Sequence, residues 1–102
     1  MLKIYTEFHD GIMFVRLDGK LSKNEVHKFR KEVTSIILEN KIEKVVFNLS
    51  NIKYIDKYGI KILLETNKIN EKSMVCNAST NLNGKLYELN VIENELEALK
   101  LC

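Results

Sequence analysis

The sequence predicts a small α/β domain: a mixed, mostly parallel sheet of four to five strands, with an antiparallel hairpin at its start and about four helices. Three observations support this class. An alternating stretch near the N-terminus is interrupted by a two-residue turn, a short apolar run occupies Val45–Leu49, and helical periodicity fills the segments between strands. A chain of 102 residues has the length of one domain. We therefore expect a single domain over residues 1–102.

Composition excludes several classes of function. The chain is 45% hydrophobic and 29% charged, as is ordinary for a globular protein, and its 16 basic and 14 acidic residues form no long run of like charge. Because the charges are spread along the chain, we expect no nucleic-acid partner. We also expect no insertion into a membrane, because no apolar stretch reaches the ~18–20 residues that span a bilayer. The N-terminus has no signal-peptide core, and Cys76 and Cys102 lie far apart. These features favour a cytoplasmic location.

The first element expected is a β-hairpin. Apolar residues alternate with polar ones from Leu2 to Phe8, Asp10-Gly11 forms the turn, and Ile12–Leu17 forms the second strand. One-sided alternation is typical of an antiparallel pair at the edge of a sheet. The tripeptide 18–20, with its glycine, then breaks the pattern.

A helix and a central strand are expected next. Ser22 and Glu25 have the spacing of a capping box, apolar residues follow at helical intervals, and Asn40 ends the helix. Val45–Leu49 is a continuous apolar run, which is typical of a strand buried on both faces and therefore central and parallel. The intervening helix supplies the crossover that parallel strands require.

The second half of the chain continues the alternation of helices and strands. A helix over Lys57–Asn70 and a strand over Ser73–Cys76 are expected first. A helix follows that Ser79-Thr80 caps and that carries Leu82, Leu86, Tyr87 and Leu89. We then expect a short last strand at Val91-Ile92 and an amphipathic helix over Glu93–Leu101, with Leu96, Leu99 and Leu101 on its apolar face.

The residue patterns of catalysis and metal binding are missing. The four glycines are too far apart for a phosphate-binding loop, and His9 and His27 have no ligand partners at suitable spacing. Cys76 lacks the local signature of a catalytic thiol and is interpreted as a small buried strand residue. We expect no enzymatic activity, no cofactor and no metal.

One segment, Asn48–Ile60, is informative about function. It leaves the buried strand, passes two apolar anchors and places Asp56 just before a helix, where its carboxylate can accept the free N–H groups of the first turn. Gly59 costs about 1 kcal/mol of helix propensity relative to alanine, which indicates that a neighbouring chain segment or a partner approaches the backbone closely. Such a turn lies at the carboxyl end of a strand, where open α/β folds bind ligands.

Three stretches resemble a known family. Val45–Leu64 resembles the signature of STAS domains of anti-sigma-factor antagonists, in which an apolar strand and an aliphatic-Asp-Ser-Ser-Gly-Leu run lead into a helix. Leu17–Leu21 is similar to the family's Leu-x-Gly-Glu-Leu, and Met74–Ser79 resembles its fourth strand and following turn. The resemblance implies a STAS-like fold and a binding module. Such a module binds an anti-sigma factor with serine kinase activity, and phosphorylation of the second serine abolishes that binding.

The motif differs from the family at its two serines. Asp56 and Gly59 match, but Lys57 and Tyr58 stand where the family has serine, so the phosphoacceptor position carries a tyrosine. The resemblance implies that Asp56, Lys57, Tyr58, Gly59 and Ile60 bind the partner, with Tyr58 as a candidate modified residue. The Tyr58 ring could instead fold back over the helix start onto the sheet edge.

Three interpretations of the function remain open. The chain is an antagonist that binds an anti-sigma factor, a serine-kinase-like protein or another regulatory protein without the usual switch, and so controls transcription. Alternatively, it is a STAS subunit of a transport or sensory complex. A third interpretation is a module regulated through Tyr58, a neighbouring residue or a bound nucleotide. In each case we expect a monomer or a weak dimer.

Overall fold

The computed structural model describes residues 1–69, 72–77 and 90–100. Within these residues a five-stranded sheet has the strand order β1-β2-β3-β4-β5. β1 and β2 are antiparallel, and every other neighbouring pair is parallel. The strands are β1 (Leu2–His9), β2 (Ile12–Leu21), β3 (Lys44–Ile55), β4 (Lys72–Cys76) and β5 (Asn90–Ile92). The predicted α/β class, with its antiparallel start, is confirmed.

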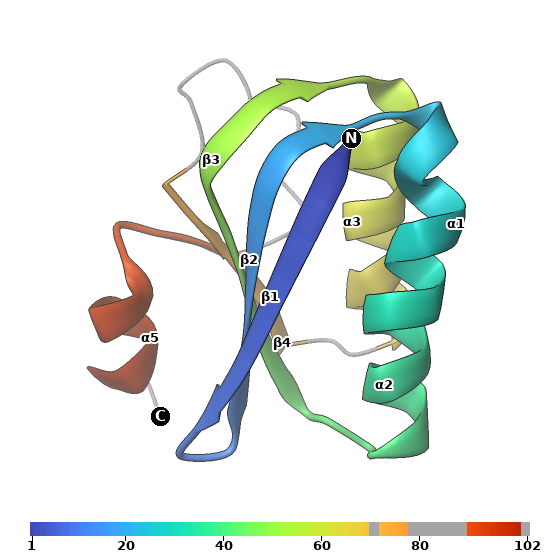
Figure 1. Ribbon diagram of the computed structural model, residues 1–102. Coiled ribbons are helices and arrows are strands. Elements are labelled where there is room, and N and C mark those ends of the chain that lie inside the picture. Colours follow the sequence, from blue (N-terminus) through green and yellow to red (C-terminus); the bar gives the residue numbers. More distant parts are fainter. Residues whose placement is uncertain (70–71, 78–89, 101–102) are drawn as a thin grey trace.

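Helices cover both faces of this sheet (Figure 1). The first helical segment runs without interruption through a 3₁₀ turn, an α turn, a π turn and a last α turn. The helices are η1 (Lys23–Glu25), α1 (Val26–Phe29), η2 (Arg30–Thr34), α2 (Ser35–Glu39), α3 (Lys57–Ile69) and α5 (Glu95–Lys100). None of the helices among the described residues is long and apolar enough to cross a membrane.

The hairpin forms at the predicted turn. Asp10 and Gly11 both have positive φ, 52° and 80°, which the two-residue turns of hairpins require, and His9 pairs with Ile12. The strand does not end at Leu17, as the sequence predicted, but continues to Leu21. Gly19 allows this continuation: its φ is 102°, and a Cβ there would overlap the carbonyl oxygen of Met1.

The central strand is also longer than predicted. Val45, Val46 and Phe47 are fully buried, as the apolar run indicated, but β3 continues for 12 residues to Ile55. The extension pairs with the extension of β2, from Asp18 opposite Asn51 to Leu21 opposite Ile55. Each unpredicted stretch supplies the hydrogen-bonding partner of the other, so residues 50–55 form a strand where a loop was expected.

The first helical segment begins and ends where the sequence predicted. The Ser22 N–H donates to Glu25 Oε1 at 3.2 Å, and the Ser22 hydroxyl donates to the same oxygen, as in a capping box. At the other end the Asn40 N–H donates to the Ile36 carbonyl at 3.0 Å. The π turn η2 was not predicted. The Ser35 hydroxyl donates to the carbonyl of Lys31 here, a side-chain bond of the kind that bends helices.

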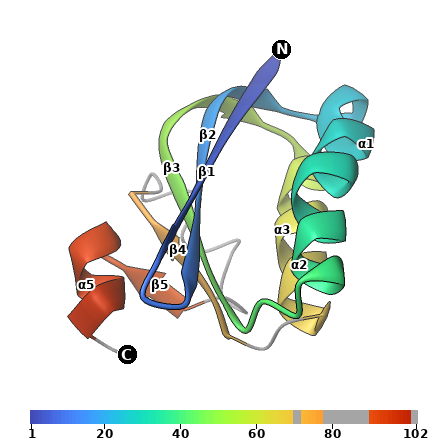
Figure 2. The same ribbon diagram turned by 60° about the horizontal axis from the view of Figure 1, so that its bottom comes forward.

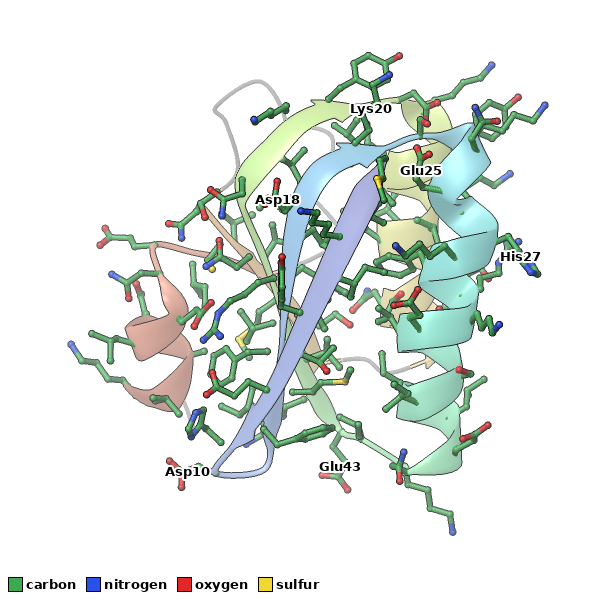
Figure 3. The ribbon with its side chains drawn as sticks, in the orientation of Figure 1. Asp10, Asp18, Lys20, Glu25, His27 and Glu43 are labelled. Atoms are coloured by element: carbon green, nitrogen blue, oxygen red, sulfur yellow. The ribbon has the colours of Figure 1, made fainter. Side chains whose placement is uncertain are left out.

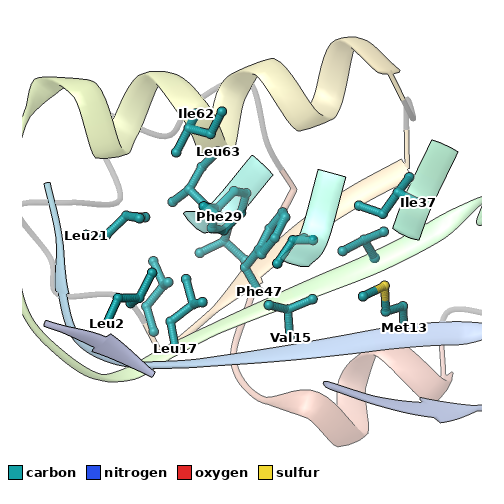
Figure 4. Close-up of a cluster of buried hydrophobic side chains, with 14 residues drawn as sticks. Leu2, Met13, Val15, Leu17, Leu21, Phe29, Ile37, Phe47, Ile62 and Leu63 are labelled. Carbon is teal, nitrogen blue, oxygen red and sulfur yellow. The ribbon is translucent and has the colours of Figure 1, made fainter. Parts of the chain in front are cut away.

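The main core lies between the sheet and the helical layer of α1, α2 and α3 (Figure 4). The rings of Phe29 and Phe47 are packed at its centre, 5.8 Å apart. The other buried members of this core are Leu2, Met13, Val15, Leu17, Leu21, Val33, Ile37, Val45, Leu49, Ile62, Leu63 and Val75. The alternation along each strand sends these side chains to one face and leaves the next residues for the opposite face.

A second, smaller core lies under α5 on the opposite face (Figures 1 and 2). Its buried residues are Ile12, Phe14, Val46, Met74, Cys76, Ile92 and Ala98. Cys76 is the buried strand residue that the sequence predicted, and burial raises the pKa of its thiol to about 11.

The end of the chain agrees with the sequence only in part. β5 confirms the short last strand, and α5 lies within the predicted final helix but starts two residues later. Leu99 packs on the second core, whereas Leu96 is 67% exposed, so its predicted place on the apolar face is wrong. The helix expected after Ser79-Thr80 lies outside the described residues.

A polar network fastens α5 to the sheet. The Arg16 guanidinium on β2 donates to both oxygens of Glu95, at 2.7 and 2.9 Å, and to Glu7 on β1 at 2.8 Å. Asn48 on β3 also donates to Glu95 at 2.8 Å. The hydrogen bonds from Arg16 hold the pKa of the Glu95 carboxyl below its ordinary value although burial raises it.

We predict that Glu95→Gln removes part of the acid sensitivity of this fold. Since folding lowers the pKa of Glu95, its contribution to stability is present above the ordinary value of 4.5 and is lost as pH falls through the folded value. The variant should be roughly 1 kcal/mol less stable near neutral pH, because Arg16 is partly exposed and screened. Urea unfolding at several pH values measures this.

The matched control for that experiment is Glu39→Gln, at an exposed position at the end of α2. As a substitution on the exposed surface it should leave the stability within about 0.5 kcal/mol of the wild type. A Glu95→Gln protein with the wild-type pH profile would contradict the role given to the Arg16–Glu95 pair.

Candidate partner-binding site

The candidate site forms where two parallel strands end side by side. β2 ends at Leu21 and leads into η1, while β3 ends at Ile55 and leads into α3. Because the strands are parallel neighbours, both helical starts lie on the side of the sheet where the carboxyl ends of these strands are found. Figure 3 shows Lys20 and Glu25 at this end of the molecule, with Asp10 and Glu43 at the other end.

Asp56 joins these two helical starts. Its Oδ1 accepts hydrogen bonds from the N–H groups of Tyr58 at 3.0 Å and Gly59 at 2.9 Å, which confirms the predicted N-cap of α3. Its Oδ2 accepts the N–H of Lys23, the first residue of η1, at 3.0 Å. Desolvation raises the pKa of Asp56, but the hydrogen bonds from Gly59, Lys23 and Tyr58 outweigh it and hold the pKa below its ordinary value.

Gly59 lies against the backbone of β2. A Cβ at this position would overlap the carbonyl oxygen of Leu21 and would stand 2.7 Å from Cγ1 of Ile55. The same Leu21 carbonyl accepts the N–H of Asp56 at 3.3 Å. The close approach that the sequence predicted at Gly59 is therefore made by the neighbouring strand of this chain.

Tyr58 lies within reach of two lysine amines at this junction. Its side chain is 38% exposed, and the Nζ atoms of Lys23 and Lys57 each lie 5.3 Å from the centre of its ring, at the distance of cation–π contacts. The ring lines a cavity between the first helical segment and α3. The described contacts of the ring are thus with residues of η1 and α3.

This cavity has a volume of about 200 Å³. Basic side chains line it, including Lys23, Arg30 and Lys61, and Val26 and Ile62 supply apolar surface. Glu65 also lines it and forms an ion pair with Arg30, Nη2 to Oε2, at 3.0 Å.

The five residues that the sequence singled out have different surroundings. Lys57 and Tyr58 are exposed, whereas Gly59 is buried, Ile60 packs against the main core and both oxygens of Asp56 are occupied by backbone N–H groups. The accessible surface is completed by side chains that the sequence did not single out, Lys23 and Lys61 among them. The sequence could have pointed to Lys61 only through its spacing, because it follows Lys57 by one helical turn and so lies on the same face of the helix.

A second cavity lies at the opposite end of the molecule. Its volume is about 630 Å³, and it is lined by residues of the β1–β2 turn and of the α2–β3 connection, such as Phe8, Gly11, Ile36 and Ile42. It contains none of the residues that the sequence singled out. No three His, Cys, Asp or Glu side chains within the described part of the chain are placed to hold a metal ion.

The sheet order, the antiparallel start and the capped helix define a small α/β module. Its candidate binding surface lies at the carboxyl ends of β2 and β3. Residues 3–94 match the STAS domain family. The chain belongs to this family.

Individual relatives agree with that assignment. The anti-sigma F factor antagonist of Paenibacillus polymyxa is 28% identical, with 96% of this chain and 92% of that protein covered. The unphosphorylated form of the anti-sigma factor antagonist SpoIIAA superposes with a TM-score of 0.82 at 17% identity, over 97% of this chain and 96% of that chain. The phosphorylated form of SpoIIAA from Bacillus gives 0.77 at 17% identity, over 97% and 98%. At this identity the two structures bear on the fold alone.

We predict that Gly59→Ala destabilises the protein although alanine favours helices. The added methyl would displace the Leu21 carbonyl, and overpacking of this kind costs about 1–3 kcal/mol. Chemical unfolding measures the change. Lys57→Ala, in the same exposed helical turn, is the matched control and should stay within about 0.5 kcal/mol of the wild type. A Gly59→Ala protein as stable as the wild type would contradict the close contact.

Proposed function

We propose that this chain is a partner-switching regulator of the anti-sigma-factor antagonist kind, which binds an anti-sigma factor or a related regulatory protein and thereby controls transcription. It acts on its partner by binding and not by catalysis. The observation that carries the proposal is the exposed Tyr58 on the first turn of α3, where Asp56 accepts the N–H groups of Tyr58 and Gly59.

The local geometry supports a binding surface. Tyrosine is enriched among the residues that dominate binding energy, because its ring offers a large contact area with few torsions to fix. The hydrogen bonds to Asp56 and the packing of Gly59 against β2 fix the backbone of this turn, and so they fix the position of the Tyr58 backbone. Little backbone freedom would be lost when a partner binds.

Tyr58 stands at the position where the family's signature has the phosphorylated serine, and we propose that the usual serine switch is absent. A kinase that transfers a phosphoryl group to a short hydroxyl at a helix start would meet a phenol that lies farther from the backbone. The Tyr58 and Gly59 N–H groups, which could otherwise stabilise a phosphate, already donate to Asp56. Binding would then be regulated by partner abundance or by another site.

We predict that Tyr58→Ala weakens partner binding roughly 30-fold or more, the loss expected for a contact worth about 2 kcal/mol. The partner is first captured from the native host with tagged wild-type protein and identified by mass spectrometry. Its affinity for purified wild type and for Tyr58→Ala is then measured by calorimetry.

Two results would count against the proposal. Capture of membrane transport proteins in place of an anti-sigma factor would favour a STAS subunit of a transport complex. Unchanged affinity in Tyr58→Ala, with the Lys31→Ala control also unchanged, would remove the α3 start from the interface. Thermal unfolding of each variant checks that the fold is retained.

We also predict that the captured kinase-like partner does not phosphorylate this chain. Incubation with that partner and ATP should leave the intact mass unchanged. A variant with Tyr58→Ser restores a short hydroxyl at the same position and serves as the positive comparison. A gain of one phosphoryl group on the wild-type chain, absent from Tyr58→Phe, would show instead that Tyr58 is the acceptor.

A further inference from the structure

The carboxylates around the α3 start are held by groups other than the lysines of the site. Asp56 accepts three backbone N–H groups, Glu25 accepts from Ser22, and Glu65 is paired with Arg30 at 3.0 Å. Asp56 and Glu25 keep their negative charges, but among the described residues neither of them is paired with a lysine side chain.

The lysines, by contrast, have no carboxylate partner within the described ranges. Lys23, Lys57 and Lys61 are exposed, and no ion pair to any of them is found among residues 1–69, 72–77 and 90–100. The amines of Lys23 and Lys57 instead each lie 5.3 Å from the centre of the Tyr58 ring, while Lys61 lines the cavity beside it. The surface around Tyr58 therefore presents lysine amines that form no ion pair within the described part of the chain.

The shape of the cavity narrows the kind of anion that fits. Its volume of about 200 Å³ lies below the ~300–1,000 Å³ of small-molecule sites, so it suits one or two side chains. The apolar surface of Val26, which is half-buried, can contact a methylene stem, and the lysines can bind a carboxylate at its end.

Lysine amines are the groups left to bind an anion at this site. The arginine of the cavity, Arg30, could bind an anion with two parallel hydrogen bonds, but it is engaged by Glu65.

We propose that the surface formed by Lys23, Lys57, Tyr58 and Lys61 docks an acidic segment of the partner protein, with an Asp or Glu side chain entering the cavity beside Tyr58. This inference rests on the proposed function, because it names the chemistry of the partner at the same site. The lysines provide attraction that is sensitive to salt, and Tyr58 provides the contact area.

The test is a titration of the ¹⁵N-labelled chain with a capped peptide, Glu-Leu-Asp-Glu-Leu-Asp, at low salt. The peptide should shift the amide signals of Lys23, Tyr58 and Lys61, and the matched peptide Gln-Leu-Asn-Gln-Leu-Asn should not. Lys61→Glu should weaken binding of the acidic peptide about tenfold or more. Lys31→Glu makes the same charge change on an exposed residue that does not line the cavity, and it should have a much smaller effect.

Several results would overturn the proposal. These are no shift with the acidic peptide, equal shifts with the amide peptide, or equal losses in Lys61→Glu and Lys31→Glu. Stronger binding of a single-stranded oligonucleotide or of phosphatidylglycerol vesicles at the same amides would also overturn it, since the occupant would then be a phosphate-bearing molecule.

The captured partner separates this proposal from the proposed function. If Tyr58→Ala abolishes binding of that partner while Lys61→Glu and Lys23→Glu do not weaken it, the regulator function stands and the acidic segment is wrong. If Tyr58→Ala leaves binding intact, the proposed function itself fails, whatever the peptide does.

Discussion

The carboxylate of Asp56 is the contact on which the candidate site depends. It accepts N–H groups from two helical starts, one of them at Lys23, 33 residues before Asp56 in the sequence, so η1 and α3 are fixed relative to one another. The Leu21 carbonyl reinforces the junction from the sheet, since it accepts the Asp56 N–H and lies where a side chain at Gly59 would stand. Lys23 and Tyr58 are brought together because their backbones share this one acceptor.

The sequence predicted the local half of this arrangement and missed the long-range half. A cap at Asp56 and a close approach at Gly59 follow from residue types within one helical turn. The bond from Lys23 does not, because it depends on how the ends of β2 and β3 pair. Those ends looked irregular separately, with Gly19 in one and Ser50-Asn51 in the other, and they form strands only because each supplies the other's hydrogen bonds. Leu96 failed for a similar reason: α5 is short, and only Ala98 and Leu99 of its apolar residues reach the second core.

The family accounts for the fold, whereas the side chains at the start of α3 determine the chemistry of the candidate site. The STAS fold accounts for the sheet and for the helices packed on it. The side chains on the turn then set the chemistry. Here the turn carries an exposed tyrosine with two lysine amines near its ring, a side chain suited to contact with a partner. The Arg16–Glu95 network lies on the opposite face of the sheet and fastens α5 without taking part in this surface.

The most direct test of the account is amide hydrogen exchange in wild type, Asp56→Asn and Asp56→Ala. If one carboxylate organises the site, the amides of Lys23, Tyr58 and Gly59 should all exchange faster in Asp56→Ala, with a smaller change in Asp56→Asn, which retains a capping oxygen. The amides of Val45–Phe47 in the centre of the sheet should stay protected. Faster exchange at Tyr58 and Gly59 with an unchanged Lys23 amide would show that Asp56 caps α3 alone, and would contradict the account.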